Sequence, residues 1–218
     1  MKTHRIFKMA VRYIFSIMVV LIAAGMVPGV SARPRIGLAL GGGGARGIAH
    51  VGVLKYLEAH QIPIDCIAGT SMGAIVGGLY AAGMTPEEIE RELENMDWAD
   101  MFSDTPAYRD LSFRRKQDES ADLFKLELGF RNGRFMMPGG LITGQKVRFK
   151  LQTLTLHAEG TQSFDDLLVP FRAVATDIET GEIVILSGGN LAEAIHASFA
   201  IPGLIDPVNI NGQLLVDG

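Results

Sequence analysis

The sequence predicts an α/β fold with a mostly parallel central sheet, and two strand-to-helix turns are the main observations behind this prediction. An apolar run at 35–40 ends in the glycine loop Gly41–Gly44 and leads into a helical pattern. A second apolar run starts at Asp65, ends in Gly69-Thr70-Ser71-Met72-Gly73 and leads into a small-residue helix. A strand, a helix and a second strand in this order form parallel strands with a right-handed crossover. Both turns therefore lie at carboxyl ends of strands, where open α/β sheets bind ligands.

The first 32 residues have the pattern of a secretory signal peptide. Four Lys or Arg residues precede an uncharged run at 13–27, and the small residues Val30-Ser31-Ala32 follow it. The run is shorter than the ~20 residues that a membrane-spanning helix needs, and an uncleaved anchor is the alternative. We expect cleavage after Ala32, a mature domain at 33–218, and export to the periplasm, the cell surface, the outer membrane or the medium.

The composition argues against a nucleic-acid-binding protein and against a domain stabilised by internal disulfides. Without the first 32 residues, four of the 20 basic residues are lost, and the remaining 16 face 24 acidic residues, a charge of −8. Such an acidic chain is a poor partner for nucleic acid. The single cysteine, Cys66, cannot form an internal disulfide, and its place inside an apolar strand predicts that it is buried.

The middle of the chain predicts two helices and a weaker strand region. Thr85-Pro86-Glu87-Glu88 has the cap, first-turn proline and capping-box acid of a helix that runs to about Met96. Residues 124–128 alternate as a strand, and Arg131–Arg134 resembles a hairpin turn. Residues 143–156 fit a helix with a basic face. We interpret this face as solvent-exposed, and a membrane-binding face is the alternative. Its cations are Lys146, Arg148 and Lys150.

The last fifty residues predict a return to regular structure. A strand at 170–177 turns through Thr180-Gly181 into a second strand at 183–186, and a short helix follows at 191–199. The dipeptide Asn211-Gly212 is a strong hairpin signal between strands at 207–210 and 213–216. This hairpin ends in Asp217-Gly218.

Ser71 has the sequence pattern of a nucleophile elbow, which exposes a hydroxyl on a tight turn between a strand and a helix. The N-terminus of the helix after Ser71 can stabilise a developing negative charge. The glycine loop is a second candidate for this task, because Gly42, Gly43 and Gly44 have no side chains to keep a substrate carbonyl away from their amides. A serine nucleophile also needs a base.

Asp217 is the best candidate for this base. The usual triad of α/β hydrolases has the order Ser, Asp, His, and no histidine follows Asp217. A free aspartate has a pKa near 3.9, so we expect the site to raise this pKa modestly by burial. An ordinary turn aspartate is the alternative. Four histidines after residue 32 are expected to be structural or surface residues rather than bases: His50, His60, His157 and His196.

The glycine loop also matches a dinucleotide-binding fingerprint through Gly42-x-Gly44-x-x-Gly47, with Asp65 about twenty residues further on. A ribose-binding acid stands at the carboxyl end of the second strand, whereas Asp65 stands at its beginning. A nucleotide-binding oxidoreductase is therefore a weaker alternative. A catalytically silent, secreted binding domain is another.

Three blocks of this sequence together resemble the signatures of the patatin-like phospholipases. The blocks are Gly42-Gly43-Gly44-Ala45-Arg46-Gly47, Gly69-Thr70-Ser71-Met72-Gly73 and Asp217-Gly218, and the likeness covers about residues 35–218. It implies a three-layer fold and a lipid acyl hydrolase that uses neither a metal nor a cofactor. Ser71 would be the nucleophile and Asp217 its only side-chain base. The implied oxyanion or substrate-binding residues are Gly42, Gly43, Gly44, Arg46, Gly47 and Met72, with Gly69, Gly73 and Gly218 as motif glycines.

The resemblance also implies partners. The substrate would be a phospholipid or another acyl ester, with contact to a membrane surface and none to nucleic acid. Together with the predicted signal peptide, the chain is similar to the patatin passengers of type V secreted proteins. In those proteins a periplasmic module and an outer-membrane barrel follow the domain, so we expect the native chain to extend beyond Gly218.

Overall fold

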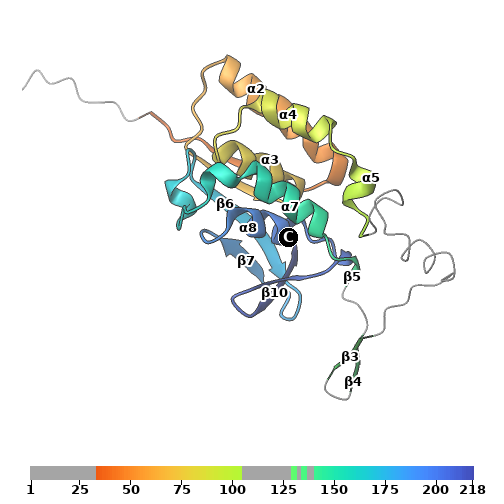
Figure 1. Cartoon of the computed structure of the whole chain (residues 1–218). Helices are drawn as coiled ribbons and strands as arrows, with labels where there is room; N and C mark the ends of the chain where they lie inside the picture. The colour runs from red at the N-terminus through yellow and green to blue at the C-terminus, as the bar shows by residue number, and fades with distance from the viewer. Residues whose placement is uncertain (1–32, 105–128, 132–133, 137–139) are drawn as a thin grey trace, which may run out of the picture. The chain divides into compact units, whose positions relative to one another are not determined.

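Six strands form the main sheet of the computed structural model, which describes residues 33–104, 129–131, 134–136 and 140–218. Strands β1, β2 and β6 are parallel, β7 and β10 run antiparallel to β6, and β9 runs antiparallel to β10. Four strands therefore share one direction, which confirms the predicted, mostly parallel sheet. Figure 1 labels β6, β7 and β10 of this sheet. The strands are β1 (Gly37–Leu40), β2 (Cys66–Thr70), β6 (Phe171–Asp177), β7 (Ile183–Leu186), β9 (Val208–Ile210) and β10 (Gln213–Asp217).

Strand β6 brings the ends of β2 and β10 together. β2 pairs with the first part of β6 and β10 with the last part, while β7 pairs with residues from both parts. Because β7 occupies one edge of β6, both β2 and β10 must lie along the other edge. β2 ends with Thr70 opposite Val174, and β10 arrives from the opposite direction and ends with Asp217 opposite Ala175. The two strands therefore meet end to end.

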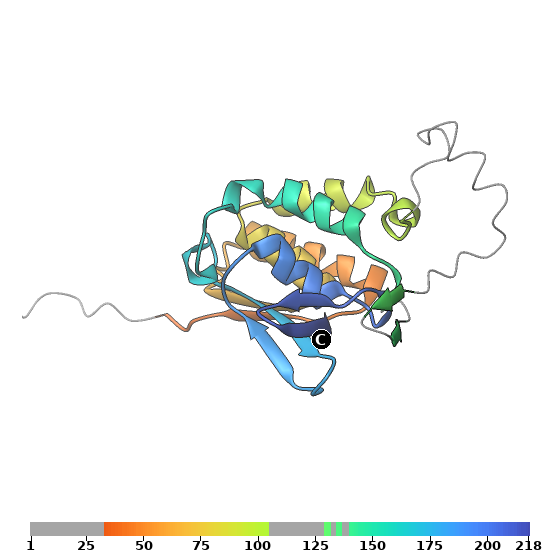
Figure 2. The same ribbon diagram turned by 60° about the horizontal axis from the view of Figure 1, so that its bottom comes forward.

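The helices are stacked in layers over the sheet (Figure 2). Helices α3 and α8 pack directly on its strands, α7 packs on α8, and α2 packs on α4. Apolar side chains between α3, α8 and the sheet form the core, including Ile67, Leu79, Phe171, Ile195 and Leu215. The helices are η1 (Gly44–Ile48), α2 (Ala49–Ala59), α3 (Met72–Ala81), α4 (Pro86–Glu94), α5 (Trp98–Met101), α7 (Gln145–Leu154), η3 (Leu156–Ala158), η4 (Phe164–Asp166) and α8 (Leu191–Phe199).

Two small pairings complete the described structure. β3 (Gly129–Arg131) and β4 (Arg134–Met136) are antiparallel and flank the predicted hairpin turn. β5 (Gly140–Ile142) pairs in parallel with β8 (Gly203–Ile205), which the sequence did not predict. The predicted signal peptide and the predicted strand at 124–128 lie outside the described residues.

Local sequence signals define several element ends. The Thr85 hydroxyl accepts the Glu88 amide while the Glu88 carboxylate accepts the Thr85 amide, which confirms the capping box of α4. Asn211 and Gly212 have φ values of 55° and 88°, the two positive values that a type I′ hairpin turn requires. This turn joins β9 to β10 and thereby sets the register that carries Asp217 toward β2.

The prediction that Cys66 is buried is wrong, because this residue is exposed. Cys66 is the first residue of β2, and Ile67, which follows it, points to the opposite, buried face of the strand. Its partner on β1 is Gly37, which has no side chain to cover the thiol. A Cβ atom added to Gly37 would lie 3.0 Å from the Cys66 sulfur.

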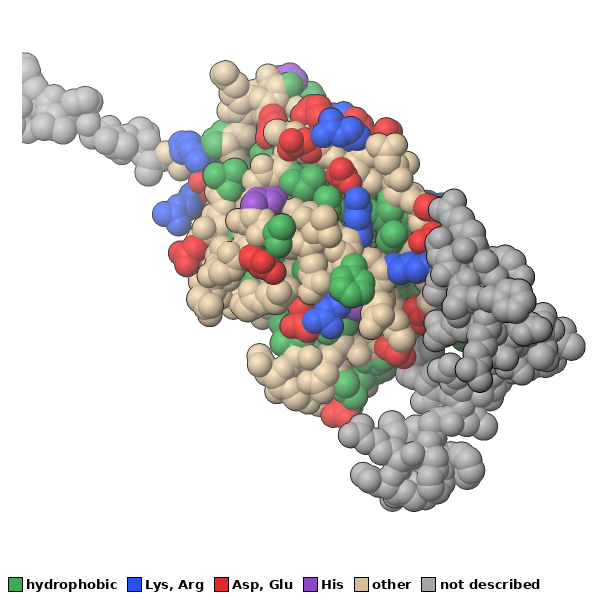
Figure 3. All heavy atoms as spheres, viewed as in Figure 1, with side chains coloured by type: hydrophobic (Ala, Val, Ile, Leu, Met, Phe, Trp, Pro, Cys, Tyr) green, Lys and Arg blue, Asp and Glu red, His purple; other side chains and the backbone are tan. Residues whose placement is uncertain are grey.

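The basic face of α7 is engaged in ion pairs with three neighbouring helices. Lys146 pairs with Asp100 of α5 at 2.6 Å, Lys150 with Glu92 of α4 at 2.6 Å, and Arg148 with Glu193 of α8 at 3.2 Å. Acidic and basic side chains accordingly lie side by side over α4 and α7 (Figure 3). Among the described helices, none has the length and hydropathy needed to cross a membrane.

Candidate active site

Ser71 occupies a strained turn between β2 and α3. Its φ of 55° and ψ of −124° are sparsely populated for a residue with a side chain, and such strain persists only where neighbouring contacts impose it. The Ser71 carbonyl accepts hydrogen bonds from the amides of Ala74 and Ile75, which begin α3. The Ser71 Oγ donates to Asp217 Oδ2 at 2.7 Å. The structure thus brings the two predicted catalytic side chains into contact, although 146 positions separate them in sequence.

The motif glycines let α3 approach the sheet closely. A Cβ atom on Gly73 would lie 2.1 Å from the Leu40 carbonyl oxygen, and one on Gly69 would lie 2.4 Å from the Gly73 carbonyl oxygen. Neither distance is possible for a real side chain. The glycines on both sides of Ser71 are therefore required by packing between the first turn of α3 and the ends of β1 and β2.

The glycine loop lies beside the nucleophile. A Cβ atom on Gly42 would be 3.1 Å from Ser71 Cβ and 3.8 Å from Ser71 Oγ, so the loop backbone borders the hydroxyl. Gly43 has a φ of 136°, which favours glycine at this turn. Neither η1 nor α3 has a side-chain N-cap, so side chains do not occupy their first amides. The Gly42 backbone and the N-terminus of α3 therefore both adjoin Ser71.

The other predicted loop residues differ in exposure. Gly47 is buried against the elbow helix, since a Cβ atom there would lie 2.6 Å from Met72 Cβ. Met72 itself is only 2 % exposed, so its side chain belongs to the core, and only its amide remains a candidate for substrate binding. The Arg46 side chain is exposed, and its amide donates to the Gly43 carbonyl at 3.2 Å.

Asp217 is half-buried at the end of β10. Burial raises the pKa of its carboxyl above the ordinary value of 3.8, and hydrogen bonds from the Ser71 hydroxyl and the Gly218 amide oppose this shift. The Asp217 amide donates to the Ala200 carbonyl at 2.9 Å. Gly218 packs tightly on β6, since a Cβ atom there would lie 2.8 Å from the Val174 carbonyl oxygen.

Three of the four histidines bond backbone carbonyls, and the ring nitrogens of His196 have no hydrogen-bond partner among the described residues. His50 donates from Nε2 to the Gly41 carbonyl at 2.9 Å and so anchors the start of the glycine loop. His60 and His157 hydrogen-bond the carbonyls of Tyr56 and Ala82. His196 is buried on α8, and burial, with a smaller contribution from the Arg148 charge, lowers its pKa to about 4.

One contact of the nucleophile involves a residue to which the sequence analysis gave no role. The Ser71 amide donates to both oxygens of Ser198, at 3.0 Å to Oγ and 3.1 Å to the carbonyl. The Ser198 hydroxyl in turn donates to the Val174 carbonyl of β6. Because Ser198 contacts Ser71 through the backbone amide, no motif of chemically reactive side chains could have revealed it.

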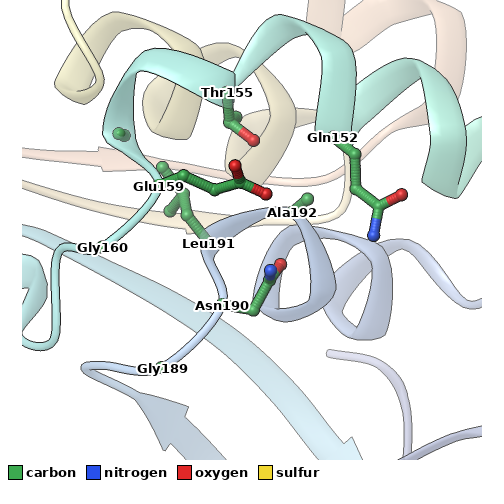
Figure 4. Close-up of a pocket in the computed structure, with 9 residues that line it drawn as sticks. Gln152, Thr155, Glu159, Gly160, Gly189, Asn190, Leu191 and Ala192 are labelled. Atoms are coloured by element: carbon green, nitrogen blue, oxygen red, sulfur yellow. The ribbon is translucent and has the colours of Figure 1, made fainter.

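A small polar hollow lies between the end of α7 and the start of α8, apart from the Ser71–Asp217 pair (Figure 4). Its volume of about 40 Å³ is suited to ordered water and is far too small for an acyl chain. Thr155 and Asn190 are among the residues that line it. Within the described part of the chain, no group of three or more His, Cys, Asp or Glu residues is arranged to hold a metal ion.

The position of Asp65 does not suit a ribose-binding acid. Its carboxylate accepts the Ile36 amide at 2.7 Å, and its own amide donates to the Ile36 carbonyl at 2.8 Å. These contacts hold it where β1 and β2 begin, at the opposite end of both strands from the glycine loop. The site as a whole combines a serine hydroxyl bonded to a carboxylate with a neighbouring glycine loop and helix N-terminus, an arrangement suited to acyl transfer.

Two relatives align in sequence with most of this chain. An uncharacterised NTE family protein of Mycobacterium tuberculosis is 36% identical over 188 residues, which is 86% of this chain and 43% of that protein. The Lysophospholipase NTE1 of Cryptococcus neoformans is 33% identical over 184 residues, 84% of this chain and 10% of that protein. The chain thus spans less than half the length of these relatives.

A solved structure and a family model also match this chain. The crystal structure of VipD from Legionella pneumophila superposes with a TM-score of 0.53 at 18% identity, covering 86% of this chain and 46% of VipD. The family model described as "Patatin-like phospholipase" matches residues 38–218, which contain the glycine loop, the elbow and Asp217. The chain therefore belongs to the patatin-like phospholipase family.

Proposed function

We propose that this domain hydrolyses acyl esters of lipids, with Ser71 as the nucleophile and Asp217 as its base. The observation that carries the proposal is the 2.7 Å hydrogen bond from the Ser71 hydroxyl, on its strained elbow, to the Asp217 carboxylate. Membership of the patatin-like phospholipase family supports a lipid substrate. The lysophospholipase relative supports a phospholipid or lysophospholipid in particular.

The first half of the reaction forms an acyl-enzyme. Ser71 Oγ attacks the ester carbonyl carbon while Asp217 takes the hydroxyl proton, and the carbonyl oxygen becomes an oxyanion. We assign the donors to this oxyanion to the amides of Gly43, Gly44 and Met72, and each such donor contributes roughly a hundred- to a thousandfold in rate. The intermediate then expels the alcohol of the lipid, which takes the proton from Asp217.

The second half of the reaction releases the fatty acid. Water attacks the acyl carbon, and Asp217 accepts its proton. The second tetrahedral intermediate then collapses, and the proton returns to Ser71 Oγ. Burial raises the pKa of Asp217, which makes the carboxylate a stronger proton acceptor than a free aspartate. The exposed side chain of Arg46, next to the glycine loop, is proposed to help orient the oxyanion hole or to stabilise the charge that develops there.

We also propose that the domain acts outside the cytoplasm. The support for this is the cationic, apolar and small-residue pattern of the first 32 residues. The exported domain would meet phospholipids at the surface of a membrane. The resemblance to the patatin passengers of type V secreted proteins supports an origin in such a longer chain.

The test is to replace Ser71 with alanine. Ser71→Ala should abolish hydrolysis of a short acyl ester and labelling by a fluorophosphonate, because it removes the hydroxyl that donates to Asp217 and would form the covalent intermediate. Ser187→Ala is the matched control, since Ser187 is exposed and outside the site, and it should keep both activities.

Two results would contradict the assignment. Turnover by the Ser71→Ala protein would show that another residue is the nucleophile. A folded wild-type chain that neither labels nor hydrolyses would favour a silent binding domain. Products from mixed phospholipids, separated by mass spectrometry, would then define the head-group and acyl preference of an active enzyme.

A further inference from the structure

Ser198 is a completely buried serine whose hydroxyl makes two hydrogen bonds. Its oxygen accepts the Ser71 amide at 3.0 Å, and its hydrogen is donated to the Val174 carbonyl. Val174 is the β6 residue opposite Thr70, the last residue of β2. The Ser198 hydroxyl therefore links the elbow to β6 at the point where β2 ends.

The end of α8 holds both members of the Ser71–Asp217 pair through their backbones. Ser198 accepts the Ser71 amide, and Ala200, two residues later, accepts the Asp217 amide at 2.9 Å. A single short segment thus fixes the separation of the two residues, whose side chains meet at 2.7 Å. Within this segment, Ser198 is the residue that makes its contact through a side chain.

We propose that Ser198 is a positioning residue that holds the Ser71 amide so that Ser71 Oγ stays aligned with Asp217 and with the oxyanion donors. This inference rests on the proposed function of Ser71. The physical reason is the strain at the elbow, where a φ of 55° requires support from surrounding contacts. The Ser71 amide lies beyond the end of the β2 ladder, so its partners come from Ser198 alone among the described hydrogen bonds.

The direct test is Ser198→Ala, which removes the hydroxyl and leaves the Ser198 carbonyl as one acceptor for the Ser71 amide. We expect kcat for a short acyl ester to fall about tenfold to a hundredfold with KM unchanged, because a displacement of the nucleophile on the order of 1 Å has this effect. The rate of fluorophosphonate labelling at saturating probe should fall in parallel. Ser198→Cys should fall between the alanine variant and the wild type, because a thiol is a weaker hydrogen-bonding group.

Thr155→Val is the matched control for a lost buried hydroxyl. Thr155 is also buried, and its hydroxyl donates to the Leu151 carbonyl at 2.9 Å, beside the small hollow between α7 and α8. The control should lower the unfolding temperature about as much as Ser198→Ala while keeping kcat. A Ser198→Ala enzyme with kcat within twofold of wild type would overturn the proposal.

Amide hydrogen exchange at Ser71, measured by NMR, tests the positioning role even if the protein does not hydrolyse esters. In Ser198→Ala the exchange rate should rise roughly fivefold, as expected for the loss of one hydrogen bond, while Thr155→Val leaves it unchanged. An unchanged rate in Ser198→Ala would refute the role of the hydroxyl.

If Ser198→Ala does not fold, kcat and the Ser71 amide exchange rate are measured on Ser198→Cys instead. Wild-type values of both in Ser198→Cys would refute the proposal. Lack of hydrolysis by the wild type refutes only the proposed function.

Discussion

At the scale of single residues, the contact between Ser71 and Asp217 is the main determinant of the site. Each residue could be picked out from the sequence, Ser71 by its elbow and Asp217 by the lack of a later histidine. Their contact could not be derived from local patterns, because it depends on which edge of β6 each strand takes. Ser198 was given no role for a related reason, since its effect passes through the amide of another residue.

The pH dependence of hydrolysis should report the state of Asp217. Burial raises its pKa above 3.8, and only the ionised carboxylate can accept a proton. The value of kcat/KM for an uncharged ester should therefore fall as the pH drops through a midpoint above 3.8. Asp217→Asn should lower kcat by roughly 10²- to 10⁴-fold and remove this acid limb. The measurement is a pH profile from 3.5 to 8 on protein shown to stay folded throughout.

Asp165→Asn is the control for this profile, because the Asp165 carboxylate pairs with Arg172 at the surface. It should retain the wild-type acid limb. A midpoint at or below 3.8, or an acid limb that survives in Asp217→Asn, would exclude Asp217 as the base.

At the scale of elements, local signals predicted what they physically determine. The boundaries of α8, the cap of α4 and the hairpin at Asn211-Gly212 follow from short-range chemistry, and the structure has all three. Cys66 was predicted wrongly because an apolar strand does not reveal which of its faces a helix covers. The basic residues of α7 were likewise ambiguous, since their carboxylate partners come from three other helices.

The hairpin turn before β10 should contribute measurably to stability. Gly212 has a φ of 88° and open space around its Cβ position, so Gly212→Ala should lower the free energy of unfolding by roughly 1–2 kcal/mol through backbone strain alone. Gly52 in α2 also has open space around this position but has helical geometry, so Gly52→Ala should raise that free energy by about 0.5–1 kcal/mol. Urea unfolding measures both, and a shift of the same sign in both variants would contradict this explanation.

At the scale of the whole molecule, the unit Arg35–Gly218 coincides with the family match at 38–218. The fold class followed from strand and helix order, because that order restricts an α/β chain to few topologies. The positions of the outer helices did not follow from the sequence, since they depend on side-chain packing between layers.

The proposed export makes a prediction about the mature protein. When the chain is expressed in a bacterial host, the exported form should begin at Arg33, because Val30-Ser31-Ala32 is a small-residue cleavage site. Intact-mass spectrometry of the periplasmic fraction identifies this end. Ala32→Lys should block the cleavage. Recovery of the full-length wild-type chain in the membrane fraction would instead support an uncleaved anchor.

The end-to-end meeting of β2 and β10 on β6 also has a consequence for timing. Ser71 and the glycine loop are synthesised before Asp217, which follows Ser71 by 146 residues. Under the proposed mechanism, an incomplete or unfolded chain has a nucleophile without its base. Under this mechanism, lipid hydrolysis is therefore delayed until β10 has docked on β6 and brought Asp217 to Ser71.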